Sequence, residues 1–271
     1  MQLQKFVSAK LPLRERELLK ALSLYFQGKA FHVSSKLSSQ NECKLPNKVL
    51  VGTHHKAGTV WLHHIFKKIC RLYNLNYSSS HRELPEFDIF LHYHSQFNFD
   101  SIHSPYRGVH IIRDPRDLII SGSFYHQKSS EKWLHIPKER FQGLTYQQKI
   151  NSYDSFDDKI LFEMEHSGHN TISQILEWDY HNPLFYEIKY ENLMQDTDLT
   201  LFHQIFSFIG FPGSIIPNVL MIAYRNSLFS GNVRSKHVRS GKSKQWSNHF
   251  KPIHKRRFVE LFDDALIKLG Y

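Results

Sequence analysis

The chain has 271 residues, of which 41% are hydrophobic and 22% charged, and this ordinary globular usage argues against a disordered protein. Its 35 Lys and Arg outweigh 25 Asp and Glu to give a formal charge of +10, which fits nucleic acid, an anionic surface or a small anionic ligand without choosing among them. The two cysteines, Cys43 and Cys70, are too few for a disulfide framework or a cysteine-rich metal site.

The first residues, MQLQKFVSAKLPLRERELLK, lack the apolar core of a signal peptide. No stretch approaches the roughly 20 apolar residues that span a bilayer. We therefore expect a soluble, cytoplasmic protein. Residues 1–46 predict an extension that packs on the main domain, with helical spacing over Leu13–Phe26 and a loop over Lys36–Lys48.

Four short apolar runs predict buried strands. They are VLVGT (Val49–Thr53), FDIFLHY (Phe87–Tyr93), GVHIIR (Gly108–Arg113) and LFYEIKY (Leu184–Tyr190). Helical patterns follow three of these runs, and the last pattern ends at Gly210, a suitable helix cap. Alternating strands and helices predict an α/β fold, with a central parallel sheet flanked by helices on both faces, in a single domain over residues 1–271.

Two segments interrupt this alternation. Residues 127–150 look like an excursion over the surface, and residues 225–250 are basic, rich in Ser and Gly, and weakly periodic. We expect residues 127–150 and 225–237 to act as lids over a substrate site, because such loops vary freely on a fixed scaffold. Their Trp, Phe and His content favours a pocket that accepts an apolar or aromatic molecule.

The first predicted strand runs into a glycine-containing turn, GTHHKAGT (Gly52–Thr59), and then into a helix. Backbone N–H groups and the helix dipole make such a junction a natural phosphate site. A Walker A loop would place Lys directly after the second Gly, whereas Lys56 precedes Gly58 by two residues. An ordinary strand–turn–helix junction with a solvated lysine is the alternative.

A second motif begins where the third strand ends, in GVHIIRDPRDLIISGSFYHQ. Arg113 lies at the strand end, and Ser121 follows two helical turns later, so that both can face one crevice. A guanidinium and a hydroxyl together suit a phosphate monoester. Helix capping explains Asp114 and Asp117 equally well, but it does not explain an Arg at this position.

Together these motifs resemble those of the sulfotransferases that use 3'-phosphoadenosine 5'-phosphosulfate (PAPS). HHKAGTVWL is similar to the family's YPKSGTTWL, and RDPRDLIIS is similar to RNPKDVAVS. YEIKYENLMQDTDLTLFHQIFSFIGFP (Tyr186–Pro212) and HVRSGKSKQWSNHFKP (His237–Pro252) resemble two later family segments, in family order. The resemblance covers about residues 47–255 and implies a P-loop-like three-layer fold with PAPS as co-substrate.

The sequence departs from the family pattern at several positions. Ala57 replaces the usual Ser and Val60 replaces a Thr, so two hydroxyl contacts to phosphate are lost. Ser240 stands where Lys is common, and Gln245 where Asp is common. The C-terminal motif often associated with dimers is not evident in KPIHKRRFVE, and the oligomeric state stays open.

The resemblance implies a set of residues that bind the nucleotide. The loop holds the 5'-phosphate; Arg113, Ser121, Arg239 and the amide of Gly241 hold the 3'-phosphate. Trp61 stacks on adenine or packs in the core, and Tyr186 is a second adenine candidate. The complete set is His55, Lys56, Ala57, Gly58, Thr59, Val60, Trp61, Arg113, Ser121, Tyr186, Arg239, Ser240 and Gly241.

Lys56 suits the stabilisation of the leaving phosphate, because it is a compact, fully charged donor. In FLHYHSQF, His94 takes the place of the family's basic histidine and His92 that of its lysine. Histidine accepts a proton near neutral pH. A carboxylate at Glu83 or Glu86 is the competing base. The reaction requires no metal, and no cluster has metal-ligand spacing.

Three other functions remain open at this point. A P-loop nucleotide kinase or NTPase would need Lys directly after Gly and a metal-holding Asp. A nucleic-acid-binding protein would need basic residues clustered with exposed aromatics. A member of the family that binds the nucleotide without turnover would keep the fold and lose the base. The acceptor is expected to be a small-molecule, lipid or sugar hydroxyl, or an amine, with no role for nucleic acid.

Overall fold

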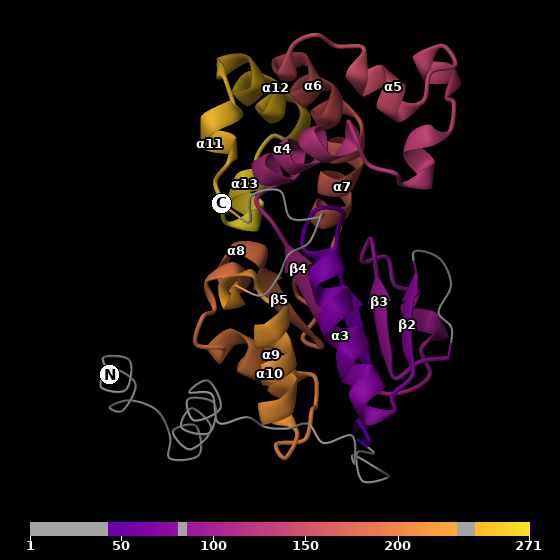
Figure 1. The fold of residues 1–271 in the computed structure, drawn as a ribbon, viewed down its shortest axis with the longest axis vertical. Coiled ribbons are helices and arrows are strands. Elements are labelled where there is room, and N and C mark those ends of the chain that lie inside the picture. Colours follow the sequence, from indigo (N-terminus) through magenta and orange to yellow (C-terminus); the bar gives the residue numbers. More distant parts are fainter. Residues whose placement is uncertain (1–42, 81–85, 232–241) are drawn as a thin grey trace, which may run out of the picture.

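The computed structural model describes residues 43–80, 86–231 and 242–271. Within them, five strands form one parallel sheet in the order β2-β3-β1-β4-β5 (Figure 1). The strands are β1 (Lys48–Gly52), β2 (Tyr77–Ser80), β3 (Ile89–His92), β4 (Tyr106–Ile112) and β5 (Phe185–Lys189). Parallel pairing brings the carboxyl ends of all five strands to one edge, where α/β proteins place their ligands.

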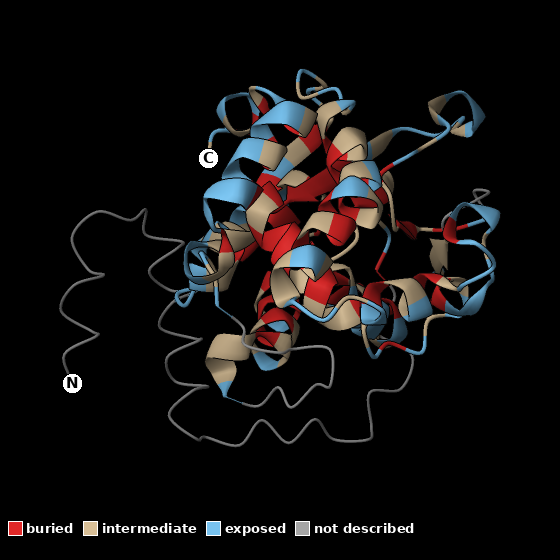
Figure 2. Ribbon diagram, turned by 90° about the horizontal axis from the view of Figure 1, so that it is seen from above, coloured by how far each residue is buried: buried red, intermediate tan, exposed pale blue. Residues whose placement is uncertain are grey.

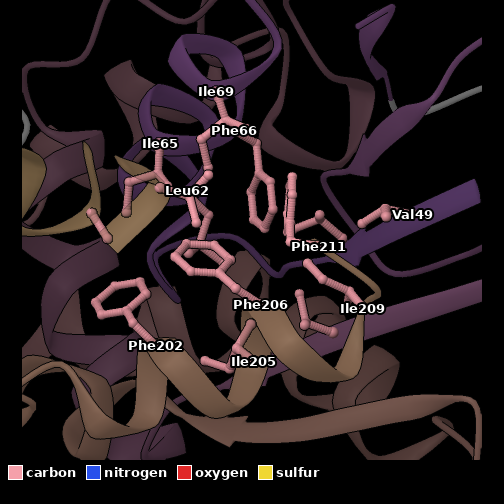
Figure 3. Packing of buried hydrophobic residues seen from close by; sticks show 14 of the residues in the cluster. Val49, Leu62, Ile65, Phe66, Ile69, Phe202, Ile205, Phe206, Ile209 and Phe211 are labelled. Atoms are coloured by element: carbon pink, nitrogen blue, oxygen red, sulfur yellow. The ribbon is translucent and has the colours of Figure 1, made fainter. Parts of the chain in front are cut away.

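One face of the sheet is covered by helices that carry a broad apolar stripe. These are α3 (Thr59–Tyr73), α9 (Thr200–Phe208) and α10 (Ile216–Asn226). Figure 3 shows Leu62, Ile65 and Phe66 of α3 against Phe202 and Phe206 of α9. Nearly all of these side chains are fully buried, so this layer is the main core of the fold.

The other face of the sheet is covered in a different way. Leu50, Phe90 and Phe185 point into an aromatic cluster that includes Phe97 and Trp178. This cluster comes from the segment after β3, with the short helix η1 (Phe99–Ser101), and from the chain that follows α7 (Ser167–Leu176). Flanking layers therefore lie on both faces, and the predicted three-layer α/β class is confirmed.

The remaining helices gather beyond the carboxyl ends of the strands (Figure 1). They are α4 (Pro115–His126), η2 (Lys132–His135), η3 (Glu139–Phe141), α5 (Tyr146–Asn151), α6 (Phe156–Glu165), α7, α11 (Trp246–His249), α12 (Pro252–Phe262) and α13 (Ala265–Leu269). The short elements α8 (Tyr190–Gln195) and η4 (Leu228–Ser230) lie after β5 and α10. Buried residues, red in Figure 2, lie in the interior of the molecule, and exposed residues, pale blue, lie around its outside.

Several sequence-based predictions change at this level. All four predicted strands exist, but the edge strand β2, with sequence YSSS, was not predicted because it has no apolar run. Residues 127–150 are not merely a surface excursion: Leu134, Phe141, Tyr146 and Ile150 bury a small core against α6. The predicted helix over Leu13–Phe26 and most of the extension over residues 1–46 lie outside the described residues.

Within the described part of the chain, no helix is both long and apolar enough to cross a lipid bilayer.

Candidate functional site

The loop between β1 and α3, residues 53–58, is here called the lysine loop. Lys56 has φ 64° and Gly58 has φ 96°, so the chain passes twice through the left-handed region before α3 begins. The N-terminus of α3 has no side-chain cap and no acidic residue in its first turn. Its first N–H groups have no intrahelical partner, which leaves an anion-binding helix end.

Side chains of the lysine loop differ in where they lie. The Thr59 hydroxyl is 3.0 Å from both Thr53 Oγ1 and the His54 carbonyl oxygen, so it ties the loop to the end of β1. Ala57 is fully buried and packs against Ile112 and Leu118. Val60 is exposed. Replacement of the usual hydroxyls by Ala57 and Val60 therefore leaves backbone N–H groups as the donors at this turn.

Trp61 belongs to the first turn of α3 and is half-buried. Its ring packs edge-on to Tyr190 at 6.0 Å and to Phe202 at 5.9 Å. Its Nε1 is buried and has no hydrogen-bond partner among the described residues. Core packing of the ring is thus observed, while the indole N–H remains able to meet a polar ligand.

Arg113 joins the lysine loop to the second motif. It follows β4 directly and is 6% exposed. Its Nη1 donates to the Lys56 carbonyl oxygen at 3.1 Å, and its guanidinium carbon lies 4.8 Å from the centre of the Tyr190 ring. Its Nε is buried and has no hydrogen-bond partner among the described residues, so this N–H group is available to a ligand.

The two aspartates of this motif play different roles. Asp114 is the N-cap of α4 and accepts from the Arg116 N–H at 2.9 Å. Asp117 lies 3.6 Å from Arg113 Nη2 and accepts from the Trp246 N–H at 3.0 Å. Burial raises the pKa of Asp117, and Arg113 opposes that shift. Ser121 lies one turn further along α4 than Asp117, so it shares the face directed to Arg113.

The tyrosine that the structure brings to this site is Tyr190, not Tyr186. Tyr186 pairs with Val109 in mid-strand, and its hydroxyl donates to Gln204 of α9 at 2.9 Å. A Cβ on Gly58 would lie 3.1 Å from the Tyr190 ring, which shows how closely that ring approaches the lysine loop. Tyr190 was not predicted as a site residue, although the YEN turn that contains it is part of the family-like segment Tyr186–Pro212.

Lys56 extends over an aromatic ring of α4. Its Nζ lies 3.4 Å from the centre of the Tyr125 ring, and the Tyr125 hydroxyl donates to Glu131 Oε1 at 2.9 Å. A ring face attracts a cation, so Tyr125 fixes the direction of the lysine. The neighbouring His55 turns toward α4 as well, where its Nε2 lies 2.8 Å from His126 Nε2. Neither Tyr125 nor His126 was predicted as a site residue.

His94 lies in the turn that follows β3. The His92 ring, 2% exposed, forms this turn by accepting from the His94 N–H at 3.1 Å. His94 Nδ1 lies 3.0 Å from Gln174 Oε1 of α7. Glu86, the competing base, is exposed and precedes β3, so it lies toward the opposite end of that strand. Glu83 lies outside the described residues.

A pocket of about 400 Å³ opens beside His94. Rings of Phe97, Phe99 and Trp178 line it, together with Gln174 and the carboxylate of Glu177. Residues 127–150, one of the two predicted lids, do not line this pocket. The second, residues 225–237, is only partly described, and Arg239, Ser240 and Gly241 lie outside the described residues.

The described residues contain no group of three or more His, Cys, Asp or Glu side chains placed to hold a metal ion.

Comparison with known proteins gives a family and a fold. The family model described as Sulfotransferase domain matches residues 46–270. No curated protein sequence matches the chain. A crystal structure of the mouse sulfotransferase SULT7A1 complexed with PAP superposes with a TM-score of 0.54 at 16% identity, over 83% of this chain and 85% of that one.

Retinol dehydratase in complex with androsterone and the inactive cofactor PAP gives a TM-score of 0.43 at 14% identity, over 83% and 82% of the two chains. The family match spans most of the chain and includes the lysine loop, Arg113 and the turn at Tyr190. This chain therefore belongs to the sulfotransferase family, and it is an enzyme that transfers a sulfuryl group.

Proposed function

We propose that this chain transfers the sulfuryl group of PAPS to the hydroxyl or amine of a small acceptor, releasing adenosine 3',5'-bisphosphate (PAP). The observation that carries this proposal is that Arg113 contacts both the lysine loop and Tyr190. This buried cation bonds the lysine loop and packs on Tyr190, with Nε still available. Two anion sites, one at the start of α3 and one at Arg113, suit a nucleotide with two separate phosphates.

In this proposal the lysine loop holds the 5'-phosphate end. Backbone N–H groups at Gly58, Thr59, Val60 and Trp61 supply the donors, because the N-terminus of α3 lacks a side-chain cap. Arg113 and Ser121 hold the 3'-phosphate, with Arg239, Ser240 and Gly241 as further candidates. Trp246, which belongs to the family-like segment over residues 237–252, donates its N–H to Asp117 beside Arg113, and this contact supports these further candidates.

The reaction breaks the bond between the sulfur and the bridging oxygen of the 5'-phosphate and forms a bond from sulfur to the acceptor oxygen. Lys56 stabilises the negative charge that grows on the leaving phosphate. His94 accepts the acceptor's proton. Donation of its Nδ1–H to the Gln174 carbonyl oxygen at 3.0 Å leaves Nε2 as the basic nitrogen.

The acceptor is proposed to occupy the pocket beside His94. Aromatic walls from Phe97, Phe99 and Trp178 favour a flat, largely apolar body, and the amide and carboxylate groups at Gln174 and Glu177 fix a polar end. A cytoplasmic location is part of the same proposal. Both cysteines, Cys43 and Cys70, are free thiols, which supports a reducing compartment.

Calorimetric titration of PAP tests the nucleotide site. The double variant R113A/S121A should bind PAP at least about 100-fold more weakly, since each charged contact contributes about 1.5–3 kcal/mol. Arg107→Ala is the matched control, because Arg107 is an exposed arginine of β4, the strand that Arg113 follows, and it lies over Phe208. Equal PAP affinity in wild type and the double variant would refute the proposal.

Turnover of labelled PAPS against phenols, alcohols, amines and sugars then identifies the acceptor class. Two further binding experiments test the kinase and nucleic-acid-binding alternatives. Magnesium-dependent binding of ATP in preference to PAP would indicate a nucleotide kinase or NTPase. Retention on DNA that persists when PAP is added would indicate a nucleic-acid-binding protein.

A further inference from the structure

A chain of hydrogen bonds runs from the lysine loop into α6 through side chains that the proposed reaction does not use. His55 Nε2 lies 2.8 Å from His126 Nε2, and His126 Nδ1 lies 2.7 Å from Glu163 Oε2. The Tyr146 hydroxyl donates to the same carboxylate oxygen at 2.8 Å. The side chains of His126 and Glu163 are 0% and 2% exposed, so this end of the series is buried, while His55 is half-buried.

With Glu163 ionised and His126 neutral, one arrangement of protons satisfies these hydrogen bonds. A carboxylate only accepts, so His126 donates through Nδ1–H and its Nε2 carries a lone pair. His55 must then donate through Nε2–H. Burial, and after it the neighbouring His126 and Lys56, lower the pKa of His55 well below its usual value, so His55 is neutral at physiological pH. The buried carboxylate thus sets the tautomers of both rings.

Aromatic rings and a glycine pack closely around these hydrogen-bonded side chains. The His55 and His126 rings are nearly coplanar, with 5.0 Å between their centres and 10° between their planes, as a hydrogen bond between the two Nε2 atoms in the ring plane requires, and Trp133 lies edge-on to His126 at 5.0 Å. Gly122 of α4 allows α6 to approach, because a Cβ there would lie 2.2 Å from Glu163 Oε1. A buried charge is costly unless it is bonded, and Glu163 Oε2 has two bonded partners here, His126 and Tyr146.

His54, which precedes His55 in the lysine loop, is hydrogen-bonded to the sheet rather than to the helices. His54 Nε2 lies 2.8 Å from His110 Nε2 of β4, and His110 Nδ1 lies 2.6 Å from Glu187 Oε2 of β5. Consecutive loop residues are therefore anchored to α4 and α6 on one side and to β4 and β5 on the other. The next residue is Lys56, which holds an unfavourable positive φ for a side chain with a Cβ.

We propose that Glu163 and His126 are positioning residues of the sulfuryl transfer, which act through His55 to hold the lysine loop in the conformation that directs Lys56 to the leaving group. The inference rests on the proposed function of Lys56. Neither residue touches the nucleotide or the acceptor in this account. Their effect reaches the reaction through the backbone at His55 and Lys56.

Glu163→Gln tests this role, because it keeps the size of the side chain and removes the charge that orients His126. We expect kcat to fall about 10- to 100-fold, the range typical for loss of an outer partner of a functional histidine. The KM for PAPS should change less, because the misplaced lysine charge acts in the transition state. Glu165→Gln is the matched control: Glu165 lies on the same helix, is exposed and pairs with Arg257.

Proton NMR of the imidazole N–H groups gives a readout that simple packing would not change. The His126 Nδ1–H, held against a carboxylate, should give a strongly downfield signal in wild type and in E165Q. That signal should move upfield in E163Q and vanish in His126→Gln, which also serves if E163Q does not fold. Ile160→Val shortens a buried side chain of α6 that takes no part in these hydrogen bonds. It should lower the melting temperature while kcat is retained.

Equal kcat in E163Q and E165Q, or no downfield signal in wild type, would overturn the inference. A loss of kcat in E163Q that I160V reproduces at the same melting temperature would overturn it as well, because stability alone would then explain the effect. If the wild-type protein does not turn over PAPS at all, the proposed function is overturned instead. The NMR comparison would still decide whether the hydrogen bonds from His55 through His126 to Glu163 exist.

Discussion

His94 Nδ1 and Gln174 Oε1 lie 3.0 Å apart, although 80 residues separate them in the chain. The amide carbonyl oxygen accepts the Nδ1–H, so the ring is held by α7 and its tautomer is set. His92 supports the same turn from beneath by accepting from the His94 N–H. A histidine oriented by a second group in this way is the arrangement that general bases use.

We therefore expect Gln174→Ala to lower kcat about 10-fold or more at neutral pH, with unchanged affinity for PAP. The base would remain but its orientation would be lost. His94→Ala should lower kcat further, by about 100-fold or more. Ser173→Ala, one residue away on α7, is the control, and steady-state kinetics with labelled PAPS is the measurement. Full activity in H94A would assign the proton to another group.

Lys56→Met should lower kcat about 100- to 1,000-fold, as expected when a donor to developing negative charge is removed. The methionine keeps most of the length of the side chain and its packing against Tyr125. Affinity for PAP should fall less than kcat, because the ammonium is most needed in the transition state. Lys67→Met, on the exposed side of α3, should leave both unchanged. Single-turnover kinetics separates chemistry from product release, and an unchanged rate in K56M would remove Lys56 from the mechanism.

Gly58→Ala should disrupt the lysine loop for two reasons. Its φ of 96° costs a residue with a Cβ about 1–2 kcal/mol, and the Cβ would lie 3.1 Å from the Tyr190 ring. Gly143→Ala has the same backbone problem at φ 84° with no atom within 4 Å. Both variants should lose stability in chemical denaturation, but only G58A should lose affinity for PAP. Equal PAP binding in the two variants would contradict a nucleotide site at this loop.

Much of this architecture could be predicted because the signals are local. The strand ending at Gly52, the uncapped helix start at Thr59 and the Arg at position 113 can each be read within a few residues. The fold class followed from their alternation, since buried parallel strands are short and apolar. The edge strand β2 gave no such signal, because YSSS is polar and its place is set by pairing with β3.

Contacts between distant residues could not be predicted in this way. Tyr186 and Tyr190 are both aromatic residues in or next to β5, so the sequence alone does not tell which of them reaches the nucleotide site. The register of β5 against β4 places Tyr186 in mid-strand and Tyr190 just after the strand. The chain from His55 through His126 to Glu163 depends on how closely α6 approaches α4, which a single sequence does not specify. The same limit hid Gln174, because nothing in α7 marks which of its polar residues faces the turn after β3.

Phe206→Ala tests the main core. Phe206 is 1% exposed and packs against Phe66, Phe202 and Phe211 between α3 and α9. We expect the free energy of unfolding to fall by about 3–5 kcal/mol, because a large cavity remains where the ring was. Ile267→Ala, 81% exposed on α13, should change it by less than about 0.5 kcal/mol. Urea denaturation measures both, and similar values in the two variants would contradict the placement of this core.

The pair of Glu187 and His110 predicts a pH dependence of stability. Desolvation raises the pKa of Glu187 to about 7 from 4.5, although its side chain is 32% exposed, and burial lowers the pKa of His110 to about 3 from 6.5. Between pH 4.5 and 7 the folded state retains the Glu187 proton that the unfolded chain has lost, so this contribution to stability falls as pH rises. His110 acts in the opposite direction between about pH 3 and 6.5, since only the unfolded chain protonates it in that range.

Glu187→Gln separates the two effects, because it keeps a neutral side chain at all pH values. The difference in unfolding free energy, wild type minus E187Q, should decrease as pH rises from 4.5 to about 7 and then level off. Trp178→Phe should extend this decrease above pH 7, because the Trp178 Nε1–H donates to Glu187 Oε1 and stabilises the ionised form. Denaturation at a series of pH values measures all three proteins. A difference that does not vary with pH would show that folding does not raise the pKa of Glu187 and would contradict this prediction.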